Sequence, residues 1–498
     1  MLAKYLKTIR ILLAVVVFTA MALLFLDVTG IAATYWGFLA KWQFVPAILS
    51  LNIIVIIGLV AATLLFGRIY CSVLCPLGIM QDGIACIRQI IRPRRRYSYS
   101  TPLTWLRIAM LVIFLSLIIL GMASIAAFIE PYSEFGRIMS SIFKPLYVAA
   151  NNIIAANEPA DSYMFYHVDY TVAIPVVIVA SITLLTVGTL AWYGGRTYCN
   201  TICPVGTILG YLSRFSWMRP MIDHSKCIGC GACSRKCKAS CIDAKKGEID
   251  YTRCVACMNC LDSCSKKAIV YAPRTLHPTH EYAATSEPDS KRRDFLTAGL
   301  ILAGTVAIKA QEKSVDGGLA PIAADKLKPS RRVRITPPGS ISHKNFTTRC
   351  TACQLCITNC PNGVLRPSTD MTHFMQPEIS YEHGYCRPEC NVCSNVCPAG
   401  AIIPIQKEER TAIQTGHAVW LSERCIAATE GVHCGNCARH CPTGAIAMIP
   451  VDADAPNGVK IPAIDTERCV GCGACENLCP VRPFSAIYVE GHEVHRNI

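Results

Sequence analysis

Cysteine is the residue type through which this chain could carry out chemistry. The 498 residues include 30 Cys, and most of them stand in tight runs rather than at the scattered spacings of a disulfide scaffold. Thiolates spaced in this way are the ligands of iron-sulfur clusters. Such clusters exchange single electrons and supply no group for acid-base chemistry on a substrate. We therefore expect an electron-transfer protein without catalytic residues of its own.

Two successive runs have the spacing of a two-cluster bacterial ferredoxin, in which the fourth Cys of each run binds the cluster of the other run. One [4Fe-4S] cluster is expected at Cys227, Cys230, Cys233 and Cys264. The other is expected at Cys254, Cys257, Cys260 and Cys237. A zinc ribbon would use only four Cys for one ion, so zinc is disfavoured. Lys238 and Ser265 replace the Pro that usually follows the fourth Cys, and Cys86 and Cys241 are interpreted as small buried residues.

Four further runs in the C-terminal part each end in Cys-Pro, and their thiolates suffice for four more [4Fe-4S] clusters. The runs are Cys350, Cys353, Cys356, Cys360; Cys386, Cys390, Cys393, Cys397; Cys425, Cys434, Cys437, Cys441; and Cys469, Cys472, Cys475, Cys479. We expect them to nest as two ferredoxin units, one inside the other. The outer pair would then exchange Cys360 and Cys479, and the inner pair Cys397 and Cys441. Pairing of neighbouring runs is the alternative.

An internal repeat carries four more cysteines. Residues 67–78 and 195–206 share the pattern Gly-Arg-x-Tyr-Cys-x3-Cys-Pro-x-Gly. Two repeats of the same orientation are related by an axis along the membrane normal. That axis would bring together Cys71, Cys75, Cys199 and Cys203 as one additional iron-sulfur site. The alternative is that each motif only ends a helix, with Pro as the breaker and Gly in the turn.

Apolar segments in the first half indicate the elements that position these cysteines. The chain is 52% hydrophobic and only 16% charged, which excludes an ordinary soluble enzyme and a disordered chain. Four stretches are long enough to cross a membrane, at about residues 10–27, 45–66, 105–128 and 171–192. No His lies in them, so haem b is not expected. The net charge of +14 gives little support to nucleic-acid binding, because metal-bound thiolates are not counted in it.

The charged loops predict the orientation of the membrane domain. Basic residues precede the first span and fill the loop between the second and third, at Lys4, Lys7, Arg10, Arg68, Arg88, Arg92, Arg94, Arg95 and Arg96. Acidic residues dominate the loop between the third and fourth spans, at Glu130, Glu134, Glu158, Asp161 and Asp169. We therefore expect the N-terminus and both repeated motifs at the cytoplasmic face of a bacterial inner membrane.

A basic segment between the two halves predicts that the C-terminal half lies in a different compartment from the ferredoxin of residues 221–275. Residues 290–296 have the twin-arginine pattern of an exported protein and precede a short, weakly apolar stretch that ends near Ile308. An interfacial helix after a chance basic run is the alternative. Export would place roughly the last 180 residues in the periplasm, with the stretch retained as a fifth membrane helix.

The expected fold class is an α-helical membrane domain of four transmembrane helices plus this fifth, with α+β bacterial ferredoxin-like domains on both sides. Residues 1–220 would form the membrane domain, and 221–275 the cytoplasmic two-cluster ferredoxin. Residues 276–340 would form the linker, and 341–498 the periplasmic four-cluster domain.

These motifs together resemble two known kinds of protein. Residues 1 to about 270 resemble NapH-type membrane ferredoxins, which are similar to the membrane parts of NosR and of the RdxA/FixG proteins. Residues 290 to about 490 resemble NapG, an exported four-cluster ferredoxin. The fusion of the two and the missing Pro residues depart from these families. The resemblance implies a quinol dehydrogenase module that passes electrons from menaquinol to a periplasmic c-type cytochrome or reductase, as in nitrate reduction.

A quinol site would need an apolar slot with a group that takes a proton. The segment after the third span is the candidate, through Glu130, Tyr132, Ser133 and Arg137. An interfacial turn anchored by Tyr and Arg is the alternative.

Other roles stay open at this stage. A maturation or metal-reducing factor of the RdxA/FixG type, a docking subunit, and a conduit between a cytoplasmic donor and the quinone pool are the alternatives. For a conduit, a membrane core of about 30 Å without a visible relay is an obstacle.

Overall fold

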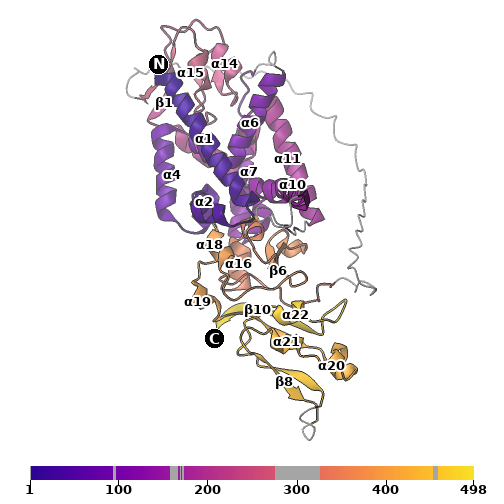
Figure 1. The fold of residues 1–498 in the computed structure, drawn as a ribbon. Coiled ribbons are helices and arrows are strands. Elements are labelled where there is room, and N and C mark those ends of the chain that lie inside the picture. Colours follow the sequence, from indigo (N-terminus) through magenta and orange to yellow (C-terminus); the bar gives the residue numbers. More distant parts are fainter. Residues whose placement is uncertain are drawn as a thin grey trace.

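The computed structural model describes residues 2–92, 97–157, 167–168, 170, 173–274, 326–452 and 458–498. In these ranges a helical domain lies between two cysteine-rich units (Figure 1). The ferredoxin unit, residues 218–274, lies at the end where the chain starts, and the C-terminal unit, residues 326–498, lies at the opposite end. The twin-arginine segment and the stretch after it lie outside the described residues, as do Arg94, Arg95, Arg96, Glu158, Asp161 and Asp169.

Four apolar helices form the frame of the helical domain. They are α1 (Leu2–Leu26), α4 (Ile53–Phe66), α7 (Thr104–Ile119) and α11 (Ile174–Gly194). By length and composition, α1 and α11 could each cross a membrane. With 14 and 16 residues, α4 and α7 reach only about 21 and 24 Å, which is short of a core of about 30 Å. Two of the four predicted spans therefore correspond to helices that are long enough to cross a membrane, α1 and α11. The other two spans stay predictions.

The outward faces of these helices carry large apolar side chains. Ile54 on α4 is 85% exposed, Ile119 on α7 is 84% exposed and Leu185 on α11 is 67% exposed. Extended apolar surface of this kind is rare on soluble monomers. The exposed apolar surface therefore extends over all four frame helices, including the two shorter ones.

Short helices fill the space between the frame helices and position the candidate sites. They are α2 (Ile31–Lys41), α3 (Phe44–Leu49), α5 (Tyr70–Val73), α6 (Pro76–Ile91), α8 (Ala123–Ala126), α9 (Pro131–Ile138), the π-helical turn Met139–Phe143, α10 (Lys144–Asn157), α12 (Thr197–Thr201) and α13 (Pro204–Ser213). Both α6 and α13 begin with Pro directly after a motif Cys. Pro fits at this position because the first turn of a helix needs no N–H donor.

Some of the basic residues that predict the orientation have structural partners instead. Arg88 is fully buried and donates to the Trp192 carbonyl near the end of α11 (3.0 Å). Arg10 is also buried and pairs with Asp82 (3.5 Å). Because the protein itself holds these side chains, they are weaker evidence for orientation than loop residues would be. The orientation stays a prediction.

The ferredoxin unit is built from short helices and strands. Its elements are β1 (Met218–Ile222), α14 (Ala232–Lys236), β2 (Ile242–Asp243), β3 (Glu248–Ile249), α15 (Asn259–Ser263) and β4 (Ile269–Pro273). The first and last strands pair antiparallel, with Ile222 opposite Ile269, and so close the unit.

The C-terminal unit is likewise made of short elements around its cysteine runs. Its helices are α16 (His343–Arg349), α17 (Leu355–Thr358), α18 (Val392–Val396), α19 (Lys407–Arg410), α20 (Ile426–Thr429), α21 (Asn436–Arg439) and α22 (Ala474–Asn477), with 3-10 turns at Met371–His373 and Ser422–Arg424. Its strands are β5 (Leu365–Pro367), β6 (Pro377–Ile379), β7 (Ile413–Trp420), β8 (Ile446–Pro450), β9 (Lys460–Ile464) and β10 (Ile487–Asn497). They form antiparallel pairs, β5 with β6, β7 with β10 and β8 with β9.

The first run of the C-terminal unit docks on the helical domain. Asn359 donates to the Leu24 carbonyl at the end of α1 (3.1 Å). Ser140 donates to the side chain of Gln354 (2.7 Å). Lys144, at the start of α10, donates to the Thr358 carbonyl. This interface therefore holds residues 354–359 against the end of the helical domain that is opposite the ferredoxin unit.

Candidate iron-sulfur sites

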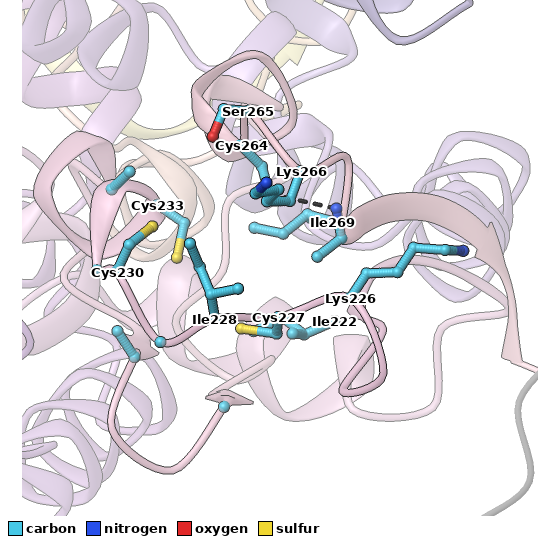
Figure 2. Close-up of a pocket in the computed structure, with 16 residues that line it drawn as sticks. Ile222, Lys226, Cys227, Ile228, Cys230, Cys233, Cys264, Ser265, Lys266 and Ile269 are labelled. Carbon is cyan, nitrogen blue, oxygen red and sulfur yellow. Dashed lines mark hydrogen bonds between the residues drawn. The ribbon is translucent and has the colours of Figure 1, made fainter.

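The first ferredoxin site has the composition that the sequence predicts. Cys227, Cys230, Cys233 and Cys264 line one cavity, together with Ile222, Ile228 and Ile269 (Figure 2). Cys227 and Cys230 come from the loop before α14, Cys233 lies in the first turn of α14, and Cys264 comes from the second run, directly after α15. The exchange of fourth ligands between the two runs is therefore present in the structure. A thiol-lined space with apolar walls fits an iron-sulfur cluster.

The second ferredoxin site contains one thiol more than predicted. Its cavity is lined by Cys237, Cys241, Cys254, Cys257 and Cys260. Cys241 is buried, as interpreted from the sequence, but its Sγ lies only 3.5 Å from the Sγ of Cys237. A lone buried Cys is therefore an incomplete description of this residue, and for Cys86 the interpretation is wrong because Cys86 is exposed on α6.

The repeated motifs form the third site. All four thiols are buried, and their mutual electrostatic interactions connect Cys199 with Cys71, and Cys203 with both Cys71 and Cys75. The two-plus-two grouping predicted from the repeat is thus the arrangement in the structure. The alternative, in which each motif only ends a helix, does not account for this grouping.

Two arginines cross between the repeats and hold them together. Arg68 of the first motif donates to the Cys199 carbonyl of the second (3.2 Å). Arg196 of the second motif donates to the Cys71 carbonyl of the first (2.7 Å). Each guanidinium also lies near the Sγ of the Cys three residues after it, at 3.7 and 3.8 Å. The motif glycines leave room for this exchange, because a Cβ on Gly206 would stand 2.9 Å from Arg68 Nη2.

The charge balance of this site fits metal-bound thiolates. Burial raises the pKa of Cys75 and of Cys203 well above the ordinary value, so free thiols would be neutral. Arg68 is fully buried, and its acceptors in the described part of the chain are carbonyl, amide and thiol groups, with no carboxylate. A buried guanidinium needs a negative partner, and a thiolate-bound cluster would supply that charge.

The ferredoxin unit contacts the site formed by the repeated motifs, hereafter the four-thiol site. The Arg196 N–H donates to the Lys238 carbonyl (2.8 Å), and Asn200 donates to the Ala239 carbonyl (3.2 Å). The ammonium group of Lys238 pairs with Asp82, which also binds Arg196 (2.6 Å). Burial alone would raise the pKa of Asp82, but Arg196 and Lys238 hold it below the ordinary value. Lys238, which stands where a Pro usually follows the fourth Cys, therefore helps to dock the ferredoxin unit on the four-thiol site.

The C-terminal runs pair with their neighbours, so the nested pairing is wrong. Cys397 lines the cavity of the first run, with Cys350, Cys353 and Cys356. Cys441 lines that of the fourth run, with Cys469, Cys472 and Cys475. Cys360 interacts with Cys390 and Cys393 of the second run. Cys479 packs in one core with Cys425 and Cys437 of the third.

This pairing has a physical reason. The chain closes two local units in succession, and a short loop costs less conformational entropy to close than a long one. Nesting would have required the first and last runs, more than a hundred residues apart, to form one unit.

The predicted quinol residues lie in and just before α9. Glu130, Tyr132, Ser133 and Arg137 are all buried. The Glu130 carboxylate accepts the Tyr132 N–H (3.1 Å) and so caps the helix, and Arg137 donates to the Ala127 carbonyl (2.8 Å). The segment is thus a buried, capped helix, and the choice between a quinol site and an interfacial turn stays a prediction.

Several buried polar atoms of α9 have no partner in the described residues. They are Tyr132 Oη, Ser133 Oγ, Glu134 Oε2, and Arg137 Nε and Nη1. Burial raises the pKa of Glu134 to about 8. Buried polar atoms without partners are uncommon in proteins and often mark a ligand, water or functional site. Glu134 was missing from the predicted site, although it lies in the same segment.

Helix α9 and the residue Ile129 before it lie beside residues of two cysteine-containing motifs. The Tyr198 hydroxyl, next to Cys199, donates to the Ile129 carbonyl (3.3 Å) and also bonds to Glu134. On the other side, a Cβ on Gly136 would collide with the Cys353 carbonyl oxygen. The segment 129–136 therefore lies between Tyr198 and the Cys353 loop, and the gap without a relay, which the sequence suggested, stays untested.

Comparison with known proteins agrees with these sites. The family described as "4Fe-4S binding domain" matches residues 49–95 and 173–221, which contain the two repeated motifs. Two families described as "4Fe-4S dicluster domain" match residues 250–364 and 430–482. No solved structure matches the chain. These matches identify 4Fe-4S binding segments in the chain and support an iron-sulfur electron-transfer role.

The relatives are ferredoxin-type proteins. The methylamine utilization ferredoxin-type protein MauM of Methylobacillus flagellatus is 31% identical over 29% of this chain and 63% of its own length. The ferredoxin-type protein NapF of Escherichia coli K12 is 28% identical over 32% of this chain and 87% of its own. The ferredoxin-type protein NapG of Haemophilus influenzae is 26% identical over 30% of this chain and 55% of its own. These relatives fit the resemblance to NapG- and NapH-like ferredoxins.

Proposed function

We propose that the protein oxidises menaquinol and passes the electrons to a periplasmic acceptor, a c-type cytochrome or an oxidoreductase. The observation that carries this proposal is the position of α9, whose Glu134 bonds to Tyr198 beside Cys199 and whose Gly136 lies against the Cys353 loop. A donor at α9 would lie beside clusters of both halves. The proposal places the protein in the inner membrane with its N-terminus in the cytoplasm and the C-terminal unit in the periplasm.

The unpartnered atoms of α9 support the quinol end. Oxidation of a quinol to a quinone releases two electrons and two protons. The electrons leave singly to the neighbouring clusters, and a carboxylate must accept a proton. Glu134 is suited to this because its pKa of about 8 lies near the working pH. Tyr132, Ser133 and Arg137 supply further polar atoms for a quinol hydroxyl.

A direct test is the reduction of the purified, oxidised protein by a menaquinol analogue, followed by EPR under anaerobic conditions. We expect the analogue to reduce the clusters, and Glu134→Gln to slow this reaction at least tenfold while leaving reduction by dithionite unchanged. Glu423→Gln is the matched control, since Glu423 is exposed in the C-terminal unit. An analogue that reduces no cluster, or equal rates in the two variants, contradicts the proposal.

A second function is favoured by the contact between the ferredoxin unit and the four-thiol site. Hydrogen bonds from Arg196 to Lys238 and from Arg68 to the Thr252 carbonyl (3.1 Å) link the ferredoxin unit to the four-thiol site. A cytoplasmic donor could therefore send electrons through the membrane domain. In proteoliposomes, reduction of the C-terminal clusters by a reductant confined to the ferredoxin side would support this conduit. No reduction without added quinol would exclude it.

A further inference from the structure

We propose that Cys241 is a fifth ligand of the second ferredoxin site and can take the place of Cys237 on the cluster. A [4Fe-4S] cluster needs four thiolates, yet five thiols line this cavity. The inference depends on the iron-sulfur sites alone and not on quinol as the donor.

The position of Cys241 places its thiol among the ligands. It is 1% exposed, and its Sγ lies 3.5 Å from the Sγ of Cys237. Its thiol also interacts with Cys254, the first Cys of the second run. A residue that only filled space would not need to contact two ligands through its sulfur atom.

Three other runs show what this position holds when a spare thiol is absent. Four residues after the fourth Cys, the corresponding residues are Ala268, Ala401 and Ala445, and each is followed by Ile. The residue before each has a positive φ, between 52° and 65°, and Ser240 before Cys241 has φ 50°. The alanines are each 1% exposed, like Cys241. The local backbone is therefore the same, and only the thiol is additional.

The shared backbone conformation places the residue four positions after the fourth Cys next to the sulfur atom of that Cys. The Ala268 N–H donates to Cys264 Sγ (3.3 Å), and the Ala445 N–H donates to Cys441 Sγ (3.3 Å). A side chain at this position is thus within reach of the same cluster. An alanine already satisfies the packing, so the thiol of Cys241 provides a function that packing does not require.

The exchange of ligands balances without an oxidant. The Cys241 thiol loses its proton as it takes the coordination position, and Cys237 gains a proton as it leaves. No electron is gained or lost. The loop concerned also carries the contacts to the four-thiol site, through Lys238 and Ala239. The exchange would therefore change the ferredoxin site where that site meets the helical domain.

The test is the iron and acid-labile sulfide content of the full-length protein, purified anaerobically in detergent. We expect Cys237→Ala and Cys241→Ala each to keep the iron content of the parent. The double variant should lose about four iron atoms per molecule, one cluster. The EPR spectrum of the reduced Cys237→Ala protein should differ from that of the parent, because one ligand has changed.

The first ferredoxin site supplies the matched control, because Ala268 occupies in it the position that Cys241 occupies in the second ferredoxin site. Its fourth ligand, Cys264, is shown in Figure 2. Cys264→Ala should lose about four iron atoms, and adding Ala268→Cys to it should restore them. If Cys237→Ala loses as much iron as Cys264→Ala, the proposal is wrong. If Cys237→Ala cannot be purified, the Cys264→Ala, Ala268→Cys protein decides: restored iron supports a ligand at this position, and unrestored iron overturns it.

Discussion

Removal of the Arg68 charge should lower the reduction potential of the four-thiol site. The guanidinium is fully buried, lies 3.7 Å from Cys71 Sγ and is bound to the Cys199 carbonyl. A positive charge stabilises the more negative, reduced form of a cluster. Arg68→Gln removes that charge, so the cluster should accept an electron less readily and its midpoint potential should fall.

The size of this effect follows from the distance. Two unit charges 4 Å apart interact by about 4 kcal/mol at an effective dielectric constant near 20. About 1.4 kcal/mol corresponds to about 59 mV for a one-electron step, which gives a ceiling of roughly 170 mV. Because the added electron is spread over the whole cluster, its mean distance from Arg68 is greater, and we expect a fall of about 50–100 mV.

The assay is an EPR redox titration of the purified protein. The signal of the four-thiol site is identified as the one that disappears in a Cys71→Ala, Cys199→Ala variant. Arg68→Lys is the control, because it keeps the charge and loses the crossing hydrogen bonds, so its potential should stay within about 30 mV of the parent. An unchanged or raised potential in Arg68→Gln would refute the reasoning.

Three further predictions concern the contacts around this site. Gly136→Val should slow electron transfer between the four-thiol site and the C-terminal clusters at least tenfold in stopped-flow measurements, because its Cβ has no room; Gly83→Ala, with open space around it, should not. Burial raises the pKa of Glu134 from 4.5 to about 8. The contribution of the neutral Glu134 side chain to folding stability is therefore complete below pH 4.5 and is lost as the pH rises through about 8. The melting temperature of Glu134→Gln should therefore rise relative to that of the parent between pH 5 and pH 9, and a constant difference would contradict this. Asp82→Asn should cost about 3–5 kcal/mol of stability in denaturant unfolding, because buried cations lose their partner, whereas Asp262→Asn, at a partly exposed ion pair, should cost about 1 kcal/mol or less.

Much of the candidate chemistry could be predicted from sequence because its determinants are local. Three thiols of each ferredoxin site come from one short segment of a loop and the start of a helix, so the spacing of Cys227, Cys230 and Cys233 already predicts that they face one site. Each of the two repeated motifs, around Cys71 and around Cys199, is local in the same sense. The symmetry between the two motifs sufficed to predict that they meet.

Other features depend on contacts between distant segments, which spacing does not encode. The reason for Lys238 is an ion pair with Asp82, more than 150 residues earlier in the chain. The role of Cys241 depends on its contact with Cys254 across two runs as well as with Cys237. The hydropathy pattern also joined α3 and α8 to the spans beside them, and it left α9 in a loop after the third span, where no separate helix was expected.

The sequence by itself therefore determined the ligand type, the number of thiol runs and the presence of an apolar helical half, since composition and short-range spacing carry that information. Only the tertiary structure decided which run supplies each fourth thiol in the C-terminal unit. It alone also placed α9 between the four-thiol site and the Cys353 loop. Both depend on which distant segments pack together, and packing is a property of the whole chain and not of any one motif.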